Sequence, residues 1–389
     1  MLGNSRVAIG GLLLASTALI AAPAVQAQDS GSMQAGRATI SVGGGSAFLI
    51  LPETKFGVVT DGARNTIQKE ENGFDDYGWN VNGAVEVPVG SRDGRRRSIA
   101  VHGFYSQVDD DSNNRCATNV GTVQCGWMNI VDDPALLQKN VFGAGSTPVS
   151  LLNDHDREVD HWSVAGELKF HRGGYGGGLK DPMPASKPSY FAIGVDFRGI
   201  DQDLDIRGTA TSPAVTGSMR YSEDLDTDYY GAFLAYGRDY RLGGPNGLWA
   251  RLGLQSSFRL QAGLYYVDTD YDATYSSSAF RGNFLLLEDS GTLSLSEDDI
   301  AFIGSLTLET RKQISRRATL SLQSEYTYYS WAPEMAYNDT DVFAGGAAVS
   351  TGFNVGTRIE DDDAFATRTS LRLTLKLGPD DIMPAEPLK

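Results

Sequence analysis

The chain has 389 residues, a formal net charge of −16 at pH 7 and 41% hydrophobic residues. This acidic balance argues against a nucleic-acid-binding protein, because basic patches supply most of that affinity. After the first 22 residues, no stretch contains the roughly 18 consecutive apolar residues that a transmembrane helix needs. The composition therefore excludes nucleic acid as a partner and predicts no helical membrane span after that point.

The first 27 residues have the pattern of a secretory signal peptide. Arg6 precedes an apolar run at residues 7–22, and small residues surround a cleavage position after Ala27. A membrane anchor is the alternative, but the apolar run is short and Pro23 follows it. We therefore expect a signal peptide at residues 1–27, followed by a periplasmic N-terminal segment at residues 28–36.

The chain contains two cysteines, Cys116 and Cys125, close together in a polar stretch. Past a signal peptide the compartment is oxidising, so one disulfide that pins a loop is expected. A metal site would need more soft ligands nearby than this stretch provides.

Apolar and polar residues alternate along most of the chain. The pattern is longest in residues 248–267, where the even positions are mainly apolar and Arg251, Arg259 and Gln261 hold odd positions. A half-buried strand has this period of two, and a bilayer-spanning strand needs only about 9–11 residues. Ten such segments are predicted: residues 37–51, 77–89, 98–108, 159–171, 189–204, 221–238, 248–267, 300–311, 318–331 and 365–377.

Two of these segments are irregular. The consecutive glycines Gly43, Gly44 and Gly45 predict a kink or bulge in the first strand. The sixth strand is apolar on both faces near residues 229–236, which leaves its orientation open.

Short and long connections alternate between the ten segments. The short ones are residues 90–97, 172–188, 239–247 and 312–317, and the long ones are residues 52–76, 109–158, 205–220, 268–299 and 332–364. Membrane barrels have short periplasmic turns and long outer loops, and an even strand count places both termini in the periplasm. Only a closed barrel satisfies every backbone group of a sheet in lipid. Splitting the first or second long connection would raise the count to 12 strands.

Aromatic residues also cluster near strand ends, as at Tyr265, Tyr266, Tyr328 and Trp331. With the signal peptide, the alternating strands and the unequal connections, they make the chain resemble a porin-like Gram-negative outer-membrane β-barrel. The resemblance is architectural. It implies an all-β fold with a transmembrane antiparallel up-and-down barrel at residues 37–377, located in the bacterial outer membrane among its lipid and lipopolysaccharide. One departure is that such barrels commonly end at an aromatic residue, whereas here Leu377 precedes a polar periplasmic tail at residues 378–389.

Charged residues are predicted to line the inside of this barrel. The basic and acidic positions are Arg198, Arg251, Arg259, Arg311, Arg368, Arg372, Lys376, Glu86, Glu167, Asp196, Glu309 and Glu325. They could form a charged constriction that selects anions or small zwitterions, or a salt-bridged plug, because a barrel of about ten strands has little interior space. The sequence leaves open whether Arg251 and Arg259 meet Glu309 across the next strand pair.

Three acidic triplets follow strands where these leave the membrane. They are Asp201, Asp203 and Asp205; Asp224, Asp226 and Asp228; and Asp268, Asp270 and Asp272. In an extended chain the three carboxylates of each triplet point to one side. One hypothesis is a calcium or magnesium site that bridges to the phosphates of surface glycolipid, and the favoured alternative is a solvated acidic rim. No other cofactor is predicted.

The pattern supports two main functional hypotheses. The first is a narrow porin-like channel for ions or small solutes, and the second is a closed structural or adhesin-type barrel whose outer loops bind a surface partner. An omptin-like surface protease is a third, based on the stretch 153–156 (Asn-Asp-His-Asp) and on His161, which resemble such chemistry only superficially. We therefore expect no enzyme, and the oligomeric state stays open.

Overall fold

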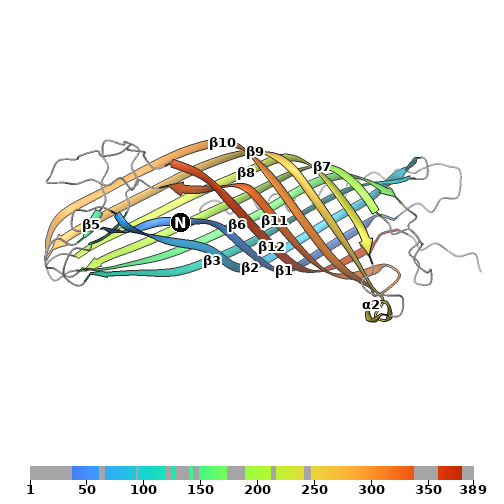
Figure 1. The fold of residues 1–389 in the computed structure, drawn as a ribbon, viewed down its shortest axis with the longest axis horizontal. Helices are drawn as coiled ribbons and strands as arrows, with labels where there is room; N and C mark the ends of the chain where they lie inside the picture. The colour runs from blue at the N-terminus through green and yellow to red at the C-terminus, as the bar shows by residue number, and fades with distance from the viewer. Residues whose placement is uncertain are drawn as a thin grey trace, which may run out of the picture. The chain divides into compact units, whose positions relative to one another are not determined.

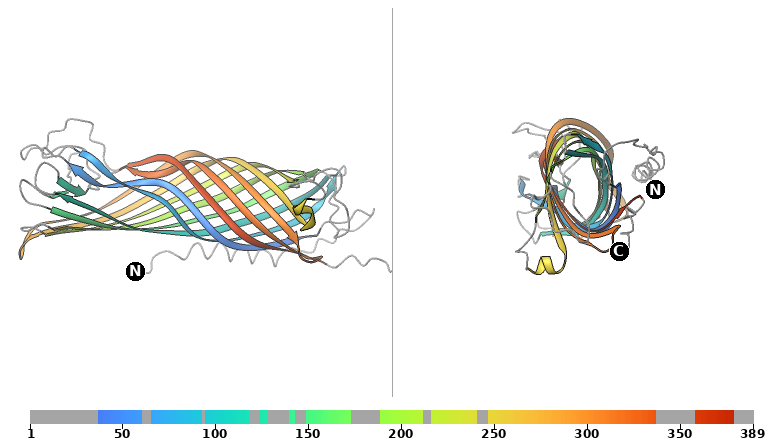
Figure 2. Two further views of the ribbon diagram at one scale, coloured as in Figure 1. Left: turned by 60° about the horizontal axis from the view of Figure 1, so that its bottom comes forward. Right: turned by 90° about the vertical axis from the view of Figure 1, so that its right-hand side faces the viewer.

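The computed structural model describes residues 37–60, 66–92, 95–118, 124–127, 140–142, 149–172, 189–211, 216–240, 247–336 and 358–378. Within them, ten long strands pair antiparallel with their neighbours in chain order, and the pairing of β12 with β1 closes the ring (Figures 1 and 2). The strands are β1 (Thr39–Thr60), β2 (Thr66–Arg92), β3 (Arg95–Thr118), β6 (Val149–Arg172), β7 (Ser189–Thr211), β8 (Thr216–Tyr240), β9 (Leu254–Arg281), β10 (Phe284–Gln313), β11 (Ala318–Ala336) and β12 (Arg358–Lys376).

The predicted ten-stranded up-and-down barrel is therefore confirmed. Two short strands, β4 (Gln124–Trp127) and β5 (Asn140–Phe142), extend the sheet from the far end of β1 to 12 strands without joining the ring. The predicted signal peptide and N-terminal segment, and the tail beyond residue 378, lie outside the described residues.

An apolar belt covers the outside of the ring. On β7 the outward side chains of Ile193 and Val195 are about half exposed, and on β9 Leu264 is 66% exposed. Large side chains of this kind are rarely left in water as one continuous patch, so the belt indicates contact with lipid. The chain is thus an outer-membrane β-barrel located in the Gram-negative outer membrane. Among the described residues, no helix is long and apolar enough to cross a membrane.

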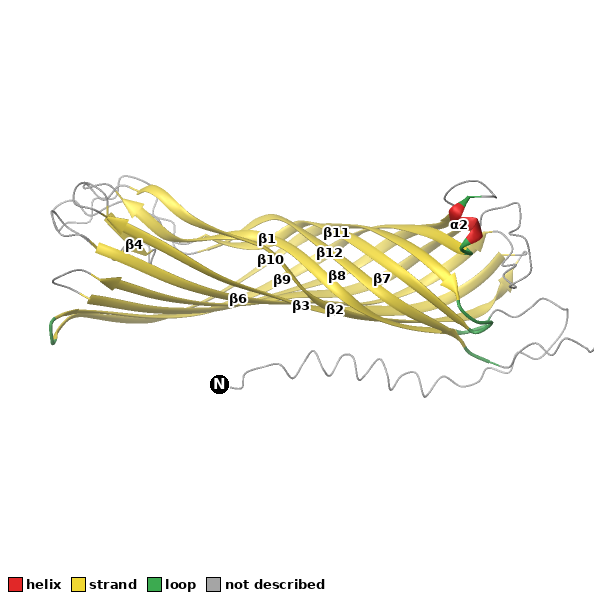
Figure 3. Cartoon of the chain, turned by 90° about the horizontal axis from the view of Figure 1, so that it is seen from below, coloured by secondary structure: helices red, strands yellow, loops and turns green. Residues whose placement is uncertain are grey.

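The strands continue far past this belt at one end of the barrel, opposite the end where β1 begins and β12 ends. We call it the extracellular end. β9 has 28 residues and β10 has 30, about three times the length that spans a bilayer (Figure 3).

The predicted loops 205–220 and 268–299 are therefore wrong, because most of each is strand. β7 and β8 pair up to Thr211 and Thr216, and β9 and β10 meet at a tight turn where Gly282 has a φ of 58°. Their acidic outward residues gave the segments the composition of a loop.

The predicted kink or bulge at residues 43–45 is also wrong, since β1 pairs with both neighbours through this stretch without a register shift. The glycine at position 45 has a packing reason instead. A Cβ atom on Gly45 would collide with the backbone carbonyl of Thr369 on β12. Close approach of the first and last strands thus explains glycine at this position of the seam.

Candidate functional site

A layer of buried side chains crosses the interior of the barrel. Every strand of the ring contributes an inward side chain that is less than 8% exposed: Ala47, Asn80, Phe104, His161, Arg198, Tyr229, Tyr265, Ile303, Tyr329 and Arg368. Several of them meet across the barrel. The ring of His161 on β6 lies 4.8 Å from that of Phe104 and 5.8 Å from that of Tyr329 on β11. The interior is therefore filled at this level.

Within the layer, Asp196 and Arg198 form a buried ion pair on β7. The Arg198 Nε donates to Asp196 Oδ2 over 2.6 Å, and the same carboxylate accepts hydrogen bonds from Ser163 Oγ at 2.9 Å and Tyr265 Oη at 3.1 Å. The Tyr329 hydroxyl lies 2.7 Å from His161 Nε2 and accepts from Arg198 Nη1 at 3.3 Å. Such bonds satisfy the charges that burial would otherwise penalise.

Two further ion pairs join different strands, one of them between strands that are not neighbours in the ring. Arg259 on β9 donates from both terminal nitrogens to the carboxylate of Glu167 on β6, at 3.2 and 3.0 Å. Arg368 on β12 donates to Glu325 on β11 at 2.6 Å. The bidentate geometry of Arg259 is the strong form of this interaction.

The sequence left open whether Arg259 meets Glu309 across the next strand pair, and in the structure Arg259 pairs with Glu167 instead. Glu309 accepts from Ser257 at 3.2 Å and lies 4.0 Å from Arg311. Arg311 in turn pairs with Asp239 on β8, so the residues near the periplasmic end form their own group.

The prediction that Arg251 lines the lumen is also wrong. It lies exposed on the one-turn helix α2 (Leu248–Arg251), and β9 begins only at Leu254, after Gly253 with a φ of 68°. Arg372 and Lys376 do face inward on β12, and Arg372 donates to Gln323 at 2.8 Å. The helical turn and the left-handed glycine after it make β9 begin later than the alternation alone indicated.

The barrel interior differs on the two sides of the buried layer. Toward the extracellular end it holds a core of apolar and aromatic side chains, including Ile200, Leu204, Tyr271 and Leu293. Toward the periplasmic end it is polar and partly open to water, since the side chains of Glu86 and Arg311 are 28% and 25% exposed. The sequence indicates this extracellular core by the apolar residues that alternate with the aspartates, such as Leu204 between Asp203 and Asp205.

The three acidic triplets all lie on the outer face, just beyond the apolar belt. Strand register places them in cross-strand rows: Asp201 beside Asp226 beside Asp270, Asp203 beside Asp224 beside Asp272, and Asp228 beside Asp268. Asp205 continues the same face of β7. The three carboxylates of each triplet thus point to one side of their strand, and carboxylates from three neighbouring strands form one surface.

Crowding of these carboxylates changes their protonation. Burial and the charges of Asp226 and Asp228 raise the pKa of Asp201 to about 7. A hydrogen bond with Asp224, together with burial, raises the pKa of Asp203 to about 8. Over the part of the chain that the structure describes, no group of three or more His, Cys, Asp or Glu side chains is placed to hold a metal ion. The calcium or magnesium bridge to glycolipid stays a prediction.

The 153–156 stretch does not bring an aspartate and a histidine together. Asp154 and Asp156 face outward on β6, whereas His155 is buried inside the barrel, where desolvation lowers its pKa to about 4. His161 is also buried and bonds to Tyr329. The alternation of a strand separates neighbours that the linear motif had placed side by side.

The sequence also predicted one disulfide, between Cys116 and Cys125. The side chains of Cys116 on β3 and Cys125 on β4 lie outside the described residues, so the bond stays a prediction.

No family model and no curated protein matches the chain in sequence. Among solved structures, it is similar to the outer membrane protease OmpT from Escherichia coli, at 9% identity and a TM-score of 0.37, over 90% of this chain and 99% of that one. A FadL homologue from Pseudomonas aeruginosa has 10% identity and a TM-score of 0.22, over 88% and 91%. The P. putida toluene transporter TodX has 8% identity and a TM-score of 0.20, over the same shares. At this distance the likenesses assign no activity to the chain.

Proposed function

We propose that the protein is a closed, non-enzymatic barrel that acts at the cell surface through the extracellular extension of its strands. The observation that carries this proposal is the buried layer, to which all ten strands of the ring contribute. It favours the closed surface-binding or structural barrel over the narrow channel.

An ion channel needs a continuous path that water can follow, and the side chains along such a path are exposed. Here Tyr229 and Tyr329 are fully buried and Tyr265 is 1% exposed. The rings of Tyr229 and Tyr329 lie 5.4 Å apart in the interior. A barrel of ten strands has little interior to spare, and these side chains with the extracellular core occupy it.

The extracellular extension is the part with surface available for binding. The four neighbouring strands β7 to β10 project beyond the apolar belt, with polar and acidic residues outward and the apolar core inward. Buried apolar contacts on the inner face hold this extension as a rigid sheet. A rigid polar surface above the membrane suits the binding of a surface partner.

Single-channel recording in a planar lipid bilayer tests the proposal. The wild-type protein should show no discrete openings, because the interior is filled. A variant with Tyr229, Tyr265 and Tyr329 all replaced by alanine should conduct, since it removes the three largest rings of the layer. Heat-modifiable migration in SDS gels shows that both proteins are folded. Discrete openings of the folded wild-type barrel would favour the channel and overturn the closed-barrel proposal.

A further inference from the structure

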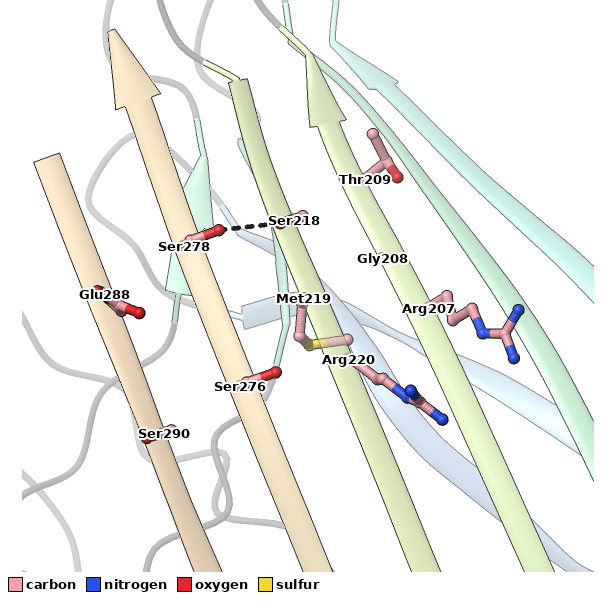
Figure 4. A pocket seen from close by; sticks show the side chains of 10 residues that line it. All are labelled: Arg207, Gly208, Thr209, Ser218, Met219, Arg220, Ser276, Ser278, Glu288 and Ser290. Atoms are coloured by element: carbon pink, nitrogen blue, oxygen red, sulfur yellow. Dashed lines mark hydrogen bonds between the residues drawn. The ribbon is translucent and has the colours of Figure 1, made fainter. Parts of the chain in front are cut away.

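A cavity of about 660 Å³ lies on the wall of the extracellular extension. Four neighbouring strands, β7 to β10, contribute its lining, and Figure 4 shows the side chains. Arg207 and Arg220 lie on one side, Glu288 on the other, and serines from β8 and β9 between them. The volume is in the range of small-molecule sites.

The two arginines are the strongest feature of this cavity. Arg207 and Arg220 are direct cross-strand partners, and like charges in this position repel each other. Their side chains are 66% and 64% exposed, and each approaches Asp205 only loosely, at 3.8 and 3.5 Å. Exposed ion pairs of this kind are weak. Asp205 Oδ2 lies near both guanidinium groups and offsets part of this repulsion. A bound anion would reduce it further, and the arginine fork matches phosphate and carboxylate.

Hydroxyl groups complete the lining. The hydroxyls of Ser218 and Ser278 hydrogen-bond to each other at 2.9 Å on the outer face, and Ser276 lies beside Arg220 in the cross-strand register. Glu288 is paired with Ser278 on the next strand. Serine hydroxyls and a carboxylate both bond to sugar hydroxyls. The cavity therefore combines donors for an anion with partners for several hydroxyls.

The height of the cavity restricts the ligand further. Tyr230 marks the top of the apolar belt on β8, and Arg220 lies ten residues further along the strand. At roughly 3.3 Å per residue and a tilt of about 40°, the arginines lie about 25 Å above the belt. This distance places them above the lipid phosphates, at the level of carbohydrate that extends from the membrane.

We propose that this cavity binds a sugar that carries a phosphate or carboxylate group, with Arg207 and Arg220 holding the anion and the serines and Glu288 holding sugar hydroxyls. The proposal rests on the proposed function, in which the extracellular extension is the binding part of the protein. The sugar can belong to surface glycolipid or be free in solution, and its chemistry is the same in both cases.

Calorimetric titration of the full-length folded protein tests this site, with glucose 6-phosphate and glucose as matched probes. Glucose 6-phosphate should bind about tenfold more tightly than glucose, and the double variant R207Q/R220Q should lose this difference. The control R281Q removes a positive charge from the same end of β9 at a residue that does not line the cavity, and it should bind as the wild type does. Equal binding of the two sugars by the wild type, or unchanged binding by R207Q/R220Q, would overturn the site.

A second titration separates the two sources of the sugar. Purified lipopolysaccharide with its core phosphates should bind the wild type more tightly than R207Q/R220Q if glycolipid is the ligand, and removal of the phosphates should abolish this difference. If glucose 6-phosphate discriminates between the two proteins and lipopolysaccharide does not, the ligand is a soluble sugar. If the wild-type barrel shows no channel openings in bilayers and also fails to bind the sugar, only the proposed site is overturned. If the wild-type barrel conducts ions, only the proposed function is overturned.

Discussion

Replacing Asp196 with alanine is a direct test of the buried layer. Asp196 is fully buried, Arg198 is 4% exposed, and the carboxylate accepts three hydrogen bonds. Removing one partner of a buried ion pair leaves an uncompensated charge, which destabilises a protein by about 3–5 kcal/mol. Because neither side chain is solvated, no allowance for solvent screening is needed. D196A should therefore lower the free energy of unfolding by about 3–5 kcal/mol.

Replacing both charges provides the internal control. In the double variant D196L/R198M, apolar side chains of similar volume fill the layer, and most of the lost stability should return, because well-packed apolar groups often replace a buried ion pair without loss. D270A removes an exposed carboxylate on the outer face and should change stability by no more than about 0.5 kcal/mol.

Urea unfolding of the barrel in lipid vesicles, followed by the fluorescence of its five tryptophans, measures all three effects. A loss of less than about 1 kcal/mol in D196A would refute the argument. So would a double variant that is less stable than D196A.

Three other predictions concern the seam, the acidic surface and the cysteines. G45V should weaken closure by about 2 kcal/mol or more, because its side chain collides with the β12 backbone, and the fraction that keeps folded migration in SDS should fall. The pKa of Asp203 is raised to about 8 by Asp224 and burial. Protonated Asp203 therefore stabilises the fold fully at a pH below its pKa in the unfolded chain, and this stabilisation is lost as the pH rises through 8. In EDTA the unfolding free energy should therefore fall between about pH 4 and pH 8 and level off above pH 8, and D203N should flatten this dependence, whereas an unchanged slope would contradict the assignment. Non-reducing peptide mapping should find the Cys116 and Cys125 peptides joined, and two free thiols would exclude the disulfide.

Which residues face lipid could be predicted from the sequence. On β9, the alternation of Leu260 and Leu264 with Arg259 and Gln261 determines which face is outward, because successive side chains of a strand point to opposite sides. The same rule predicted that the three carboxylates of each acidic triplet point to one side of the strand. The strand count also followed, since the connections of the ring alternate with its strands.

The partners of the inward charges could not be predicted in this way. Arg259 on β9 binds Glu167 on β6, 92 residues earlier in the chain, rather than Glu309 on the adjacent strand. Such a pair depends on the register of the two strands between them and on how the curvature of the closed ring brings non-adjacent strands together.

The sequence by itself determined a ten-stranded membrane barrel with a defined lipid face, because periodicity is a local property of the chain. Only the tertiary structure decided that the interior is filled and that β7 to β10 continue as strands beyond the membrane. In these strands the residues that alternate with the aspartates, such as Leu204 and Tyr271, pack into a common core. That packing exists only when the ring closes and brings the apolar faces of different strands into contact.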